Sequence, residues 1–145
     1  MGIYRKMNQA YAQRVRSVTK AITTTDLTTI GVTQAIDFAA ALPSDAVVIG
    51  GDINATAKFT GGGASSCEMD LGIKTIDADG VIDGLDVFTA IVRSSLPRGV
   101  AVPTYQGGQT PQLTVTSDVN VSTLTTGAAT CTIYYINIDK IADPS

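Results

Sequence analysis

Apolar and polar residues alternate along the middle of the chain, which is the pattern of a strand with one buried face. The longest such stretch runs from Val47 to Phe59, and Gly50–Gly51 within it predicts a bulge or a bend. We expect one side of this strand to point into a core and the other to meet water. The apolar set is Val47, Ile49, Ile53, Ala55, Ala57 and Phe59, and the polar set is Asp52, Asn54, Thr56 and Lys58.

Three further stretches carry strand patterns. Residues 66–71 alternate after the loop Gly61–Gly63, which predicts a hairpin with the preceding strand. Residues 113–119 also alternate, with a turn or bulge near Asn120. The segment 131–138 is apolar on both faces, and we therefore expect it to be a central strand.

Turn-forming residues separate these stretches. Pro43–Asp45, Asp77–Gly80 and Gly127 each predict a turn, because Pro, Gly and Asp adopt turn conformations readily. A further strand is expected to begin within residues 30–35, and residues 85–95 fit either a short helix or a strand. Short strands between such turns predict a mainly β fold, an antiparallel sandwich or barrel in a single domain over residues 30–145.

The N-terminal residues follow a different pattern. Residues 3–20 contain no Gly or Pro, and their apolar residues recur at spacings of three and four, as in an amphipathic helix. This predicts a helical arm over residues 1–20, followed by a threonine-rich linker or edge strand over residues 21–29. A helix of this length is marginal alone in water, so its stripe needs a partner, either this chain or another subunit. The stripe consists of Ile3, Met7, Ala10, Tyr11, Val15 and Val18.

Charge is distributed unevenly, although the net charge is only −3. Residues 1–20 contain five basic residues and no acidic one, whereas residues 21–145 contain five basic and thirteen acidic residues. A basic arm on an acidic body predicts a docking segment for an acidic partner, and a solvated basic helix is the simpler alternative. Nucleic acid is disfavoured because the acidic body would repel phosphates. The candidate docking residues are Arg5, Lys6, Tyr11, Arg14, Arg16 and Lys20.

The composition of the chain excludes most of the common kinds of catalytic site. The chain contains no histidine, which excludes Ser-His-Asp and Cys-His arrangements and histidine-ligated metal sites. Gly61–Gly63 lacks the Lys-Ser or Lys-Thr that completes a phosphate loop. Asp77, Asp79 and Asp83 are candidate Ca²⁺ ligands, although Asp next to Gly also forms plain tight turns. We expect neither an enzyme nor a cofactor, and a hydrolase that uses paired carboxylates is the remaining enzymatic alternative.

The two cysteines, Cys67 and Cys131, fit either buried free thiols or a disulfide, and the sequence leaves both open. No run of apolar residues is long enough to span a membrane, and we see no signal-peptide pattern. We therefore expect no membrane partner and synthesis in a reducing cytoplasm.

The order of features over residues 30–140 resembles a known group of proteins. Residues 41–51 read ALPSDAVVIGG, and a strand, a glycine-rich loop and Asp70-Leu71-Gly72 follow. An Asp- and Gly-rich turn comes next, and the closing strand follows LTTG at residues 124–127 and contains Ile133-Tyr134-Tyr135. This arrangement resembles the small β-sandwich structural proteins of tailed-phage virions, which include head decoration or cement proteins with jelly-roll-like cores. The basic arm is not part of the resemblance.

The resemblance implies a jelly-roll-like, non-enzymatic homo-oligomer, with a trimer favoured. Such a protein would bind the major capsid protein on the capsid exterior and stabilise the capsid. Its location would be the virion surface, after synthesis in the host cytoplasm, and it would need no cofactor. A tail-associated fibre or receptor-binding module is the alternative, because its core would look the same. The stoichiometry and the binding face stay open at this point.

Overall fold

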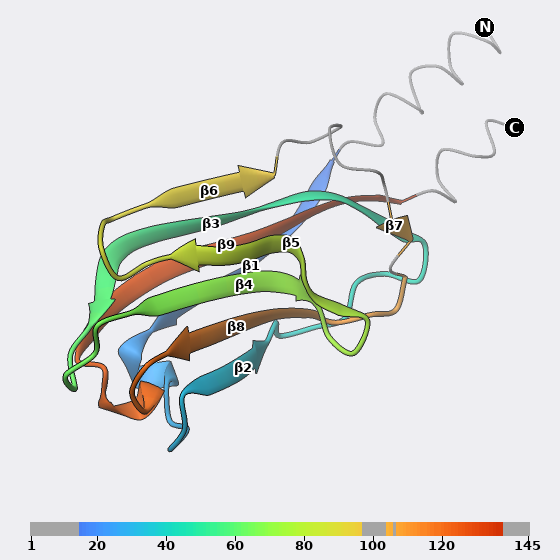
Figure 1. Ribbon diagram of the computed structural model, residues 1–145. Coiled ribbons are helices and arrows are strands. Elements are labelled where there is room, and N and C mark those ends of the chain that lie inside the picture. The colour runs from blue at the N-terminus through green and yellow to red at the C-terminus, as the bar shows by residue number, and fades with distance from the viewer. Residues whose placement is uncertain (1–14, 97–103, 106, 138–145) are drawn as a thin grey trace, which may run out of the picture.

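The computed structural model describes residues 15–96, 104–105 and 107–137, which form nine strands and two short 3₁₀ helices (Figure 1). These described parts of the chain contain no α-helix. The strands are β1 (Arg16–Thr23), β2 (Thr33–Asp37), β3 (Ala46–Thr60), β4 (Cys67–Ile73), β5 (Asp77–Asp86), β6 (Arg93–Leu96), β7 (Thr104–Tyr105), β8 (Pro111–Ser117) and β9 (Thr126–Asn137). The 3₁₀ helices are η1 (Thr24–Asp26) and η2 (Val121–Thr123).

The strands form two antiparallel sheets that lie over one another (Figure 1). Sheet A has the strand order β1-β9-β3-β6, with β7 also pairing with β3, and sheet B has the order β2-β8-β4-β5. The mainly β, antiparallel fold predicted from the alternation is confirmed. The last strand, β9, lies between β1 and β3, so its predicted central position is confirmed as well.

Apolar side chains from both sheets fill the space between the layers. In β4, Cys67, Met69 and Leu71 are buried, while Glu68 is exposed, as the alternation predicted. Burying a side chain as large as leucine or phenylalanine contributes roughly 1.5–3 kcal/mol, so this layer is the main source of stability. The largest fully buried apolar side chains include Ile22, Ile53, Phe59, Met69, Leu71, Leu113 and Ile133.

The predicted bulge in β3 is confirmed by a register shift against β9 between Val48 and Gly50. One extra residue reverses which side chains face the core. Val48 belongs to the core cluster before the bulge, and Phe59 belongs to it afterwards. The prediction that Val47 and Ile49 share the core-facing side with Phe59 is therefore wrong, since both are buried outside that cluster.

The loop Gly61–Gly63 does not close a hairpin, so that prediction is wrong. It carries the chain from β3 in sheet A to β4 in sheet B. All three glycines have positive φ angles, of 117°, 60° and 80°. A Cβ atom at Gly61 would lie 2.3 Å from Thr125 Oγ1. Glycine is required because the backbone turns in the left-handed region while passing close to Thr125.

Residues 16–20 form a strand, so this part of the predicted N-terminal helix is wrong. Strand β1 pairs with β9 along its whole length, from Arg16 opposite Tyr135 to Thr23 opposite Ala128. Val18 packs against the core and Ile22 belongs to it, and their spacing of four fits a strand as well as a helix. The other predicted helical residues lie outside the described residues. The predicted linker, residues 21–29, begins inside β1 and also contains η1.

The segments that the sequence left open are now assigned. Residues 85–95 contain no helix, because β5 continues to Asp86 and β6 begins at Arg93. The turn between them is held by Asp86 Oδ1, which accepts hydrogen bonds from the backbone N–H groups of Phe88 (2.9 Å) and Thr89 (3.1 Å). The strand expected to begin within residues 30–35 is β2, which starts at Thr33.

Candidate docking faces

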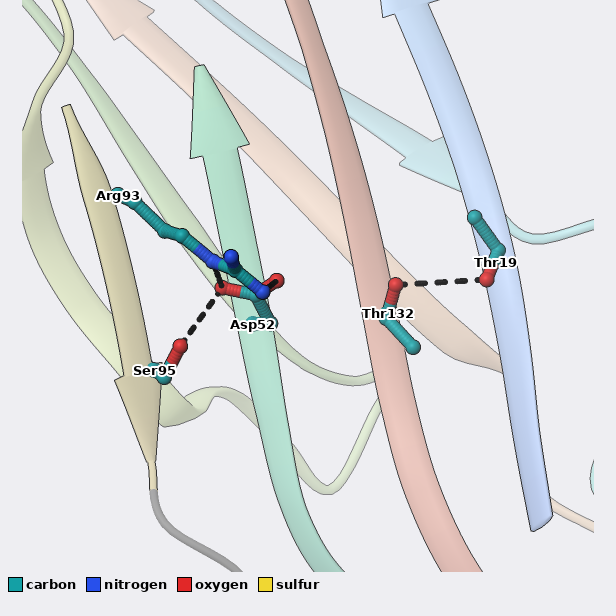
Figure 2. Close-up of polar contacts among 5 residues, drawn as sticks. All are labelled: Thr19, Asp52, Arg93, Ser95 and Thr132. Atoms are coloured by element: carbon teal, nitrogen blue, oxygen red, sulfur yellow. Dashed lines mark hydrogen bonds and ion pairs between the residues drawn. The ribbon is translucent and has the colours of Figure 1, made fainter. Parts of the chain in front are cut away.

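The outer face of sheet A carries a row of polar residues that crosses four strands. Thr19 lies opposite Thr132, Thr132 opposite Asp52, and Asp52 opposite Ser95. Figure 2 shows this row, with the hydroxyls of Thr19 and Thr132 3.3 Å apart. Its side chains bind one another, so their polar groups are largely satisfied before any partner arrives.

Asp52 is the only carboxylate on the strands of sheet A, and it is held by two neighbours (Figure 2). Arg93 donates from Nε to Oδ1 (3.1 Å) and from Nη2 to Oδ2 (3.0 Å), and Ser95 Oγ donates to Oδ1 (2.8 Å). Asp52 is only 5% exposed, whereas the Arg93 side chain is 62% exposed. The hydrogen bonds and charge of Asp52 raise the pKa of Arg93. The fork geometry therefore neutralises a carboxylate on an outward-facing sheet.

Removing the Arg93 side chain is expected to destabilise the fold, because it leaves the buried Asp52 carboxylate with Ser95 as its remaining described donor. Arg93→Ala is expected to lower the urea midpoint in the wild-type background and much less in an Asp52→Ala background. The measurement is a double-mutant cycle followed by circular dichroism. Lys58→Ala, another basic residue of sheet A, is the control and is expected to change little. If Arg93→Ala lowered the urea midpoint equally in both backgrounds, the Asp52–Arg93 ion pair would contribute nothing to stability.

The outer face of sheet B is acidic. Glu68 on β4 lies directly opposite Asp86 on β5. Asp70 is the next outward residue on β4, and its Oδ1 accepts a hydrogen bond from the backbone N–H of Gly84 (2.7 Å). Like charges directly opposite each other across two strands repel. This face therefore has an unfavourable arrangement of charge in the isolated chain.

Charge is separated between the two sheets. The strands of sheet B contain no lysine or arginine, and Lys74, which follows β4, forms an ion pair of 2.6 Å with Asp37. The chain therefore presents one sheet with a basic excess and one strongly acidic sheet. The charged residues in the strands of sheet A are Arg16, Lys20, Lys58, Arg93 and Asp52, and those in sheet B are Asp37, Glu68, Asp70, Asp77, Asp79, Asp83 and Asp86.

Two of the docking residues predicted from sequence lie in the described part of the chain. Arg16 and Lys20 are both on the edge strand β1, with Arg16 exposed and Lys20 half-buried. The others, Arg5, Lys6, Tyr11 and Arg14, lie outside the described residues. The Asp52–Arg93–Ser95 cluster was missed, because only the register between β3 and β6 brings these residues together.

The candidate Ca²⁺ ligands Asp77, Asp79 and Asp83 all lie on β5. A hydrogen bond with Asp79 raises the pKa of Asp77, as expected when two carboxyl groups share a proton. Among residues 15–96, 104–105 and 107–137, no three acidic or thiol side chains are grouped as a metal site would require. The turn predicted at Asp77–Gly80 is wrong, because these residues lie within β5 and the turn after β4 is at residues 74–76.

Asp118, immediately after β8, holds the loop that passes between the sheets. Its Oδ1 accepts hydrogen bonds from the backbone N–H groups of Ser65 (3.0 Å) and Ser66 (3.2 Å), and the Ser65 hydroxyl donates to Oδ2. These bonds, led by the Ser65 hydroxyl, lower the pKa of Asp118 from 3.8 to about 2. The sequence pattern marked Asp118 only as a polar strand position, since its partners are remote in the chain.

Asp118 is expected to make stability depend on pH. Because its folded-state pKa is lowered, its contribution is present above about pH 3.8 and is lost as the pH falls toward about 2. Asp118→Asn is expected to be less stable than wild type at neutral pH, with the difference narrowing over that acidic range. Urea unfolding at several pH values measures this. Ser65→Ala removes one donor to Asp118, and its stability is expected to lie between those of wild type and Asp118→Asn. A stability difference between wild type and Asp118→Asn that did not change with pH would contradict the lowered pKa of Asp118.

Both cysteines are buried and free, so the thiol alternative holds and no disulfide forms. Cys67 is on β4 of sheet B and Cys131 on β9 of sheet A. Burial raises the pKa of each thiol to about 12. They act as small apolar core residues.

Comparisons with known proteins give one fold relationship. No protein-family model matches this chain, and no curated protein sequence matches it. Within the described residues, no helix is long and apolar enough to cross a membrane. The structure is similar to a chain of the cyanophage Pam1 capsid asymmetric unit, with a TM-score of 0.58 and 16% sequence identity. The match covers 86% of this chain and 85% of that chain, so the two share a fold over nearly their whole lengths.

Proposed function

We propose that this chain is a non-enzymatic structural protein of a phage virion that binds the capsid exterior and stabilises it as a decoration oligomer, with a trimer favoured. The observation that carries the proposal is the fold shared with a chain of a phage capsid asymmetric unit. The match covers similar shares of both chains, so the two are also similar in length. The absence of histidine from the sequence supports a structural role over a catalytic one.

The outer face of sheet A is the proposed contact with the major capsid protein. The hydroxyls of Thr19 and Thr132 and the carboxylate of Asp52 are already hydrogen-bonded on this face. Burial against a partner therefore costs less desolvation than burial of unpaired groups would. Its basic excess favours an acidic patch on the capsid.

A glutamate in the middle of this face tests the proposal. Thr132→Glu is expected to weaken binding to expanded capsids of the chain's own phage by about tenfold or more, because it places a negative charge against the acidic capsid patch in the centre of the contact. The control is Ile76→Glu, which adds the same charge at an exposed turn between β4 and β5. Co-sedimentation with capsids measures binding, and circular dichroism checks folding.

Two outcomes would overturn the proposal. The first is a wild-type chain that neither binds capsids nor raises the temperature at which they are disrupted. The second is an image of the intact particle that locates the chain on the tail. A tail location would support the fibre or receptor-binding alternative instead. Equal binding by Thr132→Glu and Ile76→Glu would reject sheet A as the contact while leaving capsid binding in place.

A further inference from the structure

The acidic strip on sheet B has no basic partner in the described part of the chain. We define this strip as Glu68, Asp70 and Asp86, which lie together on the outward sides of β4 and β5. The ion pairs among the described residues are Lys74–Asp37 and Arg93–Asp52, and neither includes a member of the strip. Hydrogen bonds, led by that from the Thr89 hydroxyl, lower the pKa of Asp86 and keep it charged. Glu68 lies directly opposite, so the two like charges repel and a cation on this face would relieve the repulsion.

The sequence contains a segment of the opposite charge. Residues 1–14 include Arg5, Lys6 and Arg14 and no acidic residue. They lead into β1, the edge strand of sheet A. The charge of this segment is opposite in sign to that of the acidic strip, and each has three charged side chains.

The positions of β1 and the strip favour docking between two copies. Strand β1 lies at one edge of sheet A, and β5 lies at the edge of sheet B that contacts β6, the opposite edge strand of sheet A (Figure 1). To cover its own strip, the segment would have to pass around β2 and cross the outer face of β2 and β8. An extended chain spans about 3.3 Å per residue, so fourteen residues reach up to about 46 Å, far enough to cross to the strip of a neighbouring copy.

We propose that the basic N-terminal segment, residues 1–14, of one copy binds the acidic strip of a second copy and holds the oligomer together. The contact is electrostatic and lies on an accessible face, so salt weakens it. Each copy contributes both a segment and a strip, so the contact can repeat around a closed ring of identical subunits. This inference concerns association between copies and is tested without capsids, so its failure leaves the capsid-binding proposal intact.

Charge reversal on each side of the contact tests the inference with the full chain. Arg5→Glu/Lys6→Glu alters the segment, and Glu68→Lys alters the strip. Each variant alone is expected to raise the dissociation constant of the oligomer about tenfold or more, as measured by analytical ultracentrifugation. Raising the salt concentration is expected to weaken the wild-type oligomer in the same direction. Lys58→Glu, a charge reversal on β3 of sheet A, is the control and is expected to leave the dissociation constant unchanged.

Mixing the two variants separates docking between copies from docking within one copy. The Glu68→Lys chain retains an intact segment, and the Arg5→Glu/Lys6→Glu chain retains an intact strip. The mixture is therefore expected to form mixed oligomers more tightly than either variant forms its own. No recovery on mixing, a wild-type chain that is monomeric, or variants that associate as tightly as wild type would each overturn the inference. Circular dichroism of every variant checks that the sheets are folded.

Discussion

Replacing Gly127 with alanine is expected to lower the free energy of unfolding by about 3 kcal/mol, one of the largest effects of any small substitution in this chain. Gly127 is the second residue of the long strand β9 and has a φ angle of +151°, which L-residues rarely adopt. A Cβ atom there would lie 2.3 Å from Cδ1 and 2.6 Å from Cγ of Phe59. Phe59 is fully buried, so its ring cannot move aside without disturbing the core.

Gly63→Ala is the matched control for this prediction. Gly63 also has a positive φ angle, of +80°, but a Cβ atom there would meet nothing within 4 Å. Its substitution is expected to cost only the backbone term, about 1 kcal/mol. Urea unfolding of both variants separates the cost of the left-handed backbone from the cost of the clash. Equal destabilisation of the two variants would show that the Phe59 ring yields without cost.

Deleting residues 1–20 is expected to destabilise the domain by about 3 kcal/mol, because backbone hydrogen bonds contribute about 1 kcal/mol each and the deletion removes most of β1. Strand β1 runs from Arg16 to Thr23, and Val18 within it packs against the core. Loss of Arg16–Lys20 also exposes the edge of β9 to water. Had these residues formed a separate helix, the same deletion would leave the sheets intact.

A chain that begins at Val15 is the matched control for this deletion. It keeps all of β1, so its thermal unfolding midpoint is expected to match that of the full chain. On the inference above, it is nevertheless expected to lose self-association. Thermal unfolding followed by circular dichroism distinguishes the two truncations. If the chain lacking residues 1–20 unfolded at the wild-type temperature, the pairing of β1 with β9 would contribute little.

Strands that alternate over many residues could be predicted from the sequence, whereas the partners of those strands could not. The alternation in β4 and β8 is largely kept in the structure because one face of each is buried, whereas residues 46–53 of β3 are all buried. The N-terminal prediction failed at β1, where apolar residues spaced by four fit both a helix and a strand. Pairing with β9 decides between them, and this pairing joins residues more than a hundred positions apart.

The sequence predicted that the chain carries separate basic and acidic regions, but it did not predict which sheet face each region occupies. Counting charges identified the basic N-terminal residues and the acidic remainder. It could not show that the acids collect on sheet B, because this depends on which strands share a sheet. Likewise, Asp52 was predicted as an outward polar residue, while its bond to Arg93 depends on the register between β3 and β6.

The two buried thiols can be used to measure how often the core of the domain opens. With a pKa of about 12, each thiol is ionised in only about one molecule in 10⁵ at neutral pH, and the ionised form is the reactive one. Thiol reagents therefore modify Cys67 or Cys131 only when the core around that residue opens. Since one cysteine lies in each sheet, mass spectrometry of the modified protein can compare the opening of sheet A with that of sheet B. The same measurement on assembled particles would reveal which layer an attached partner protects.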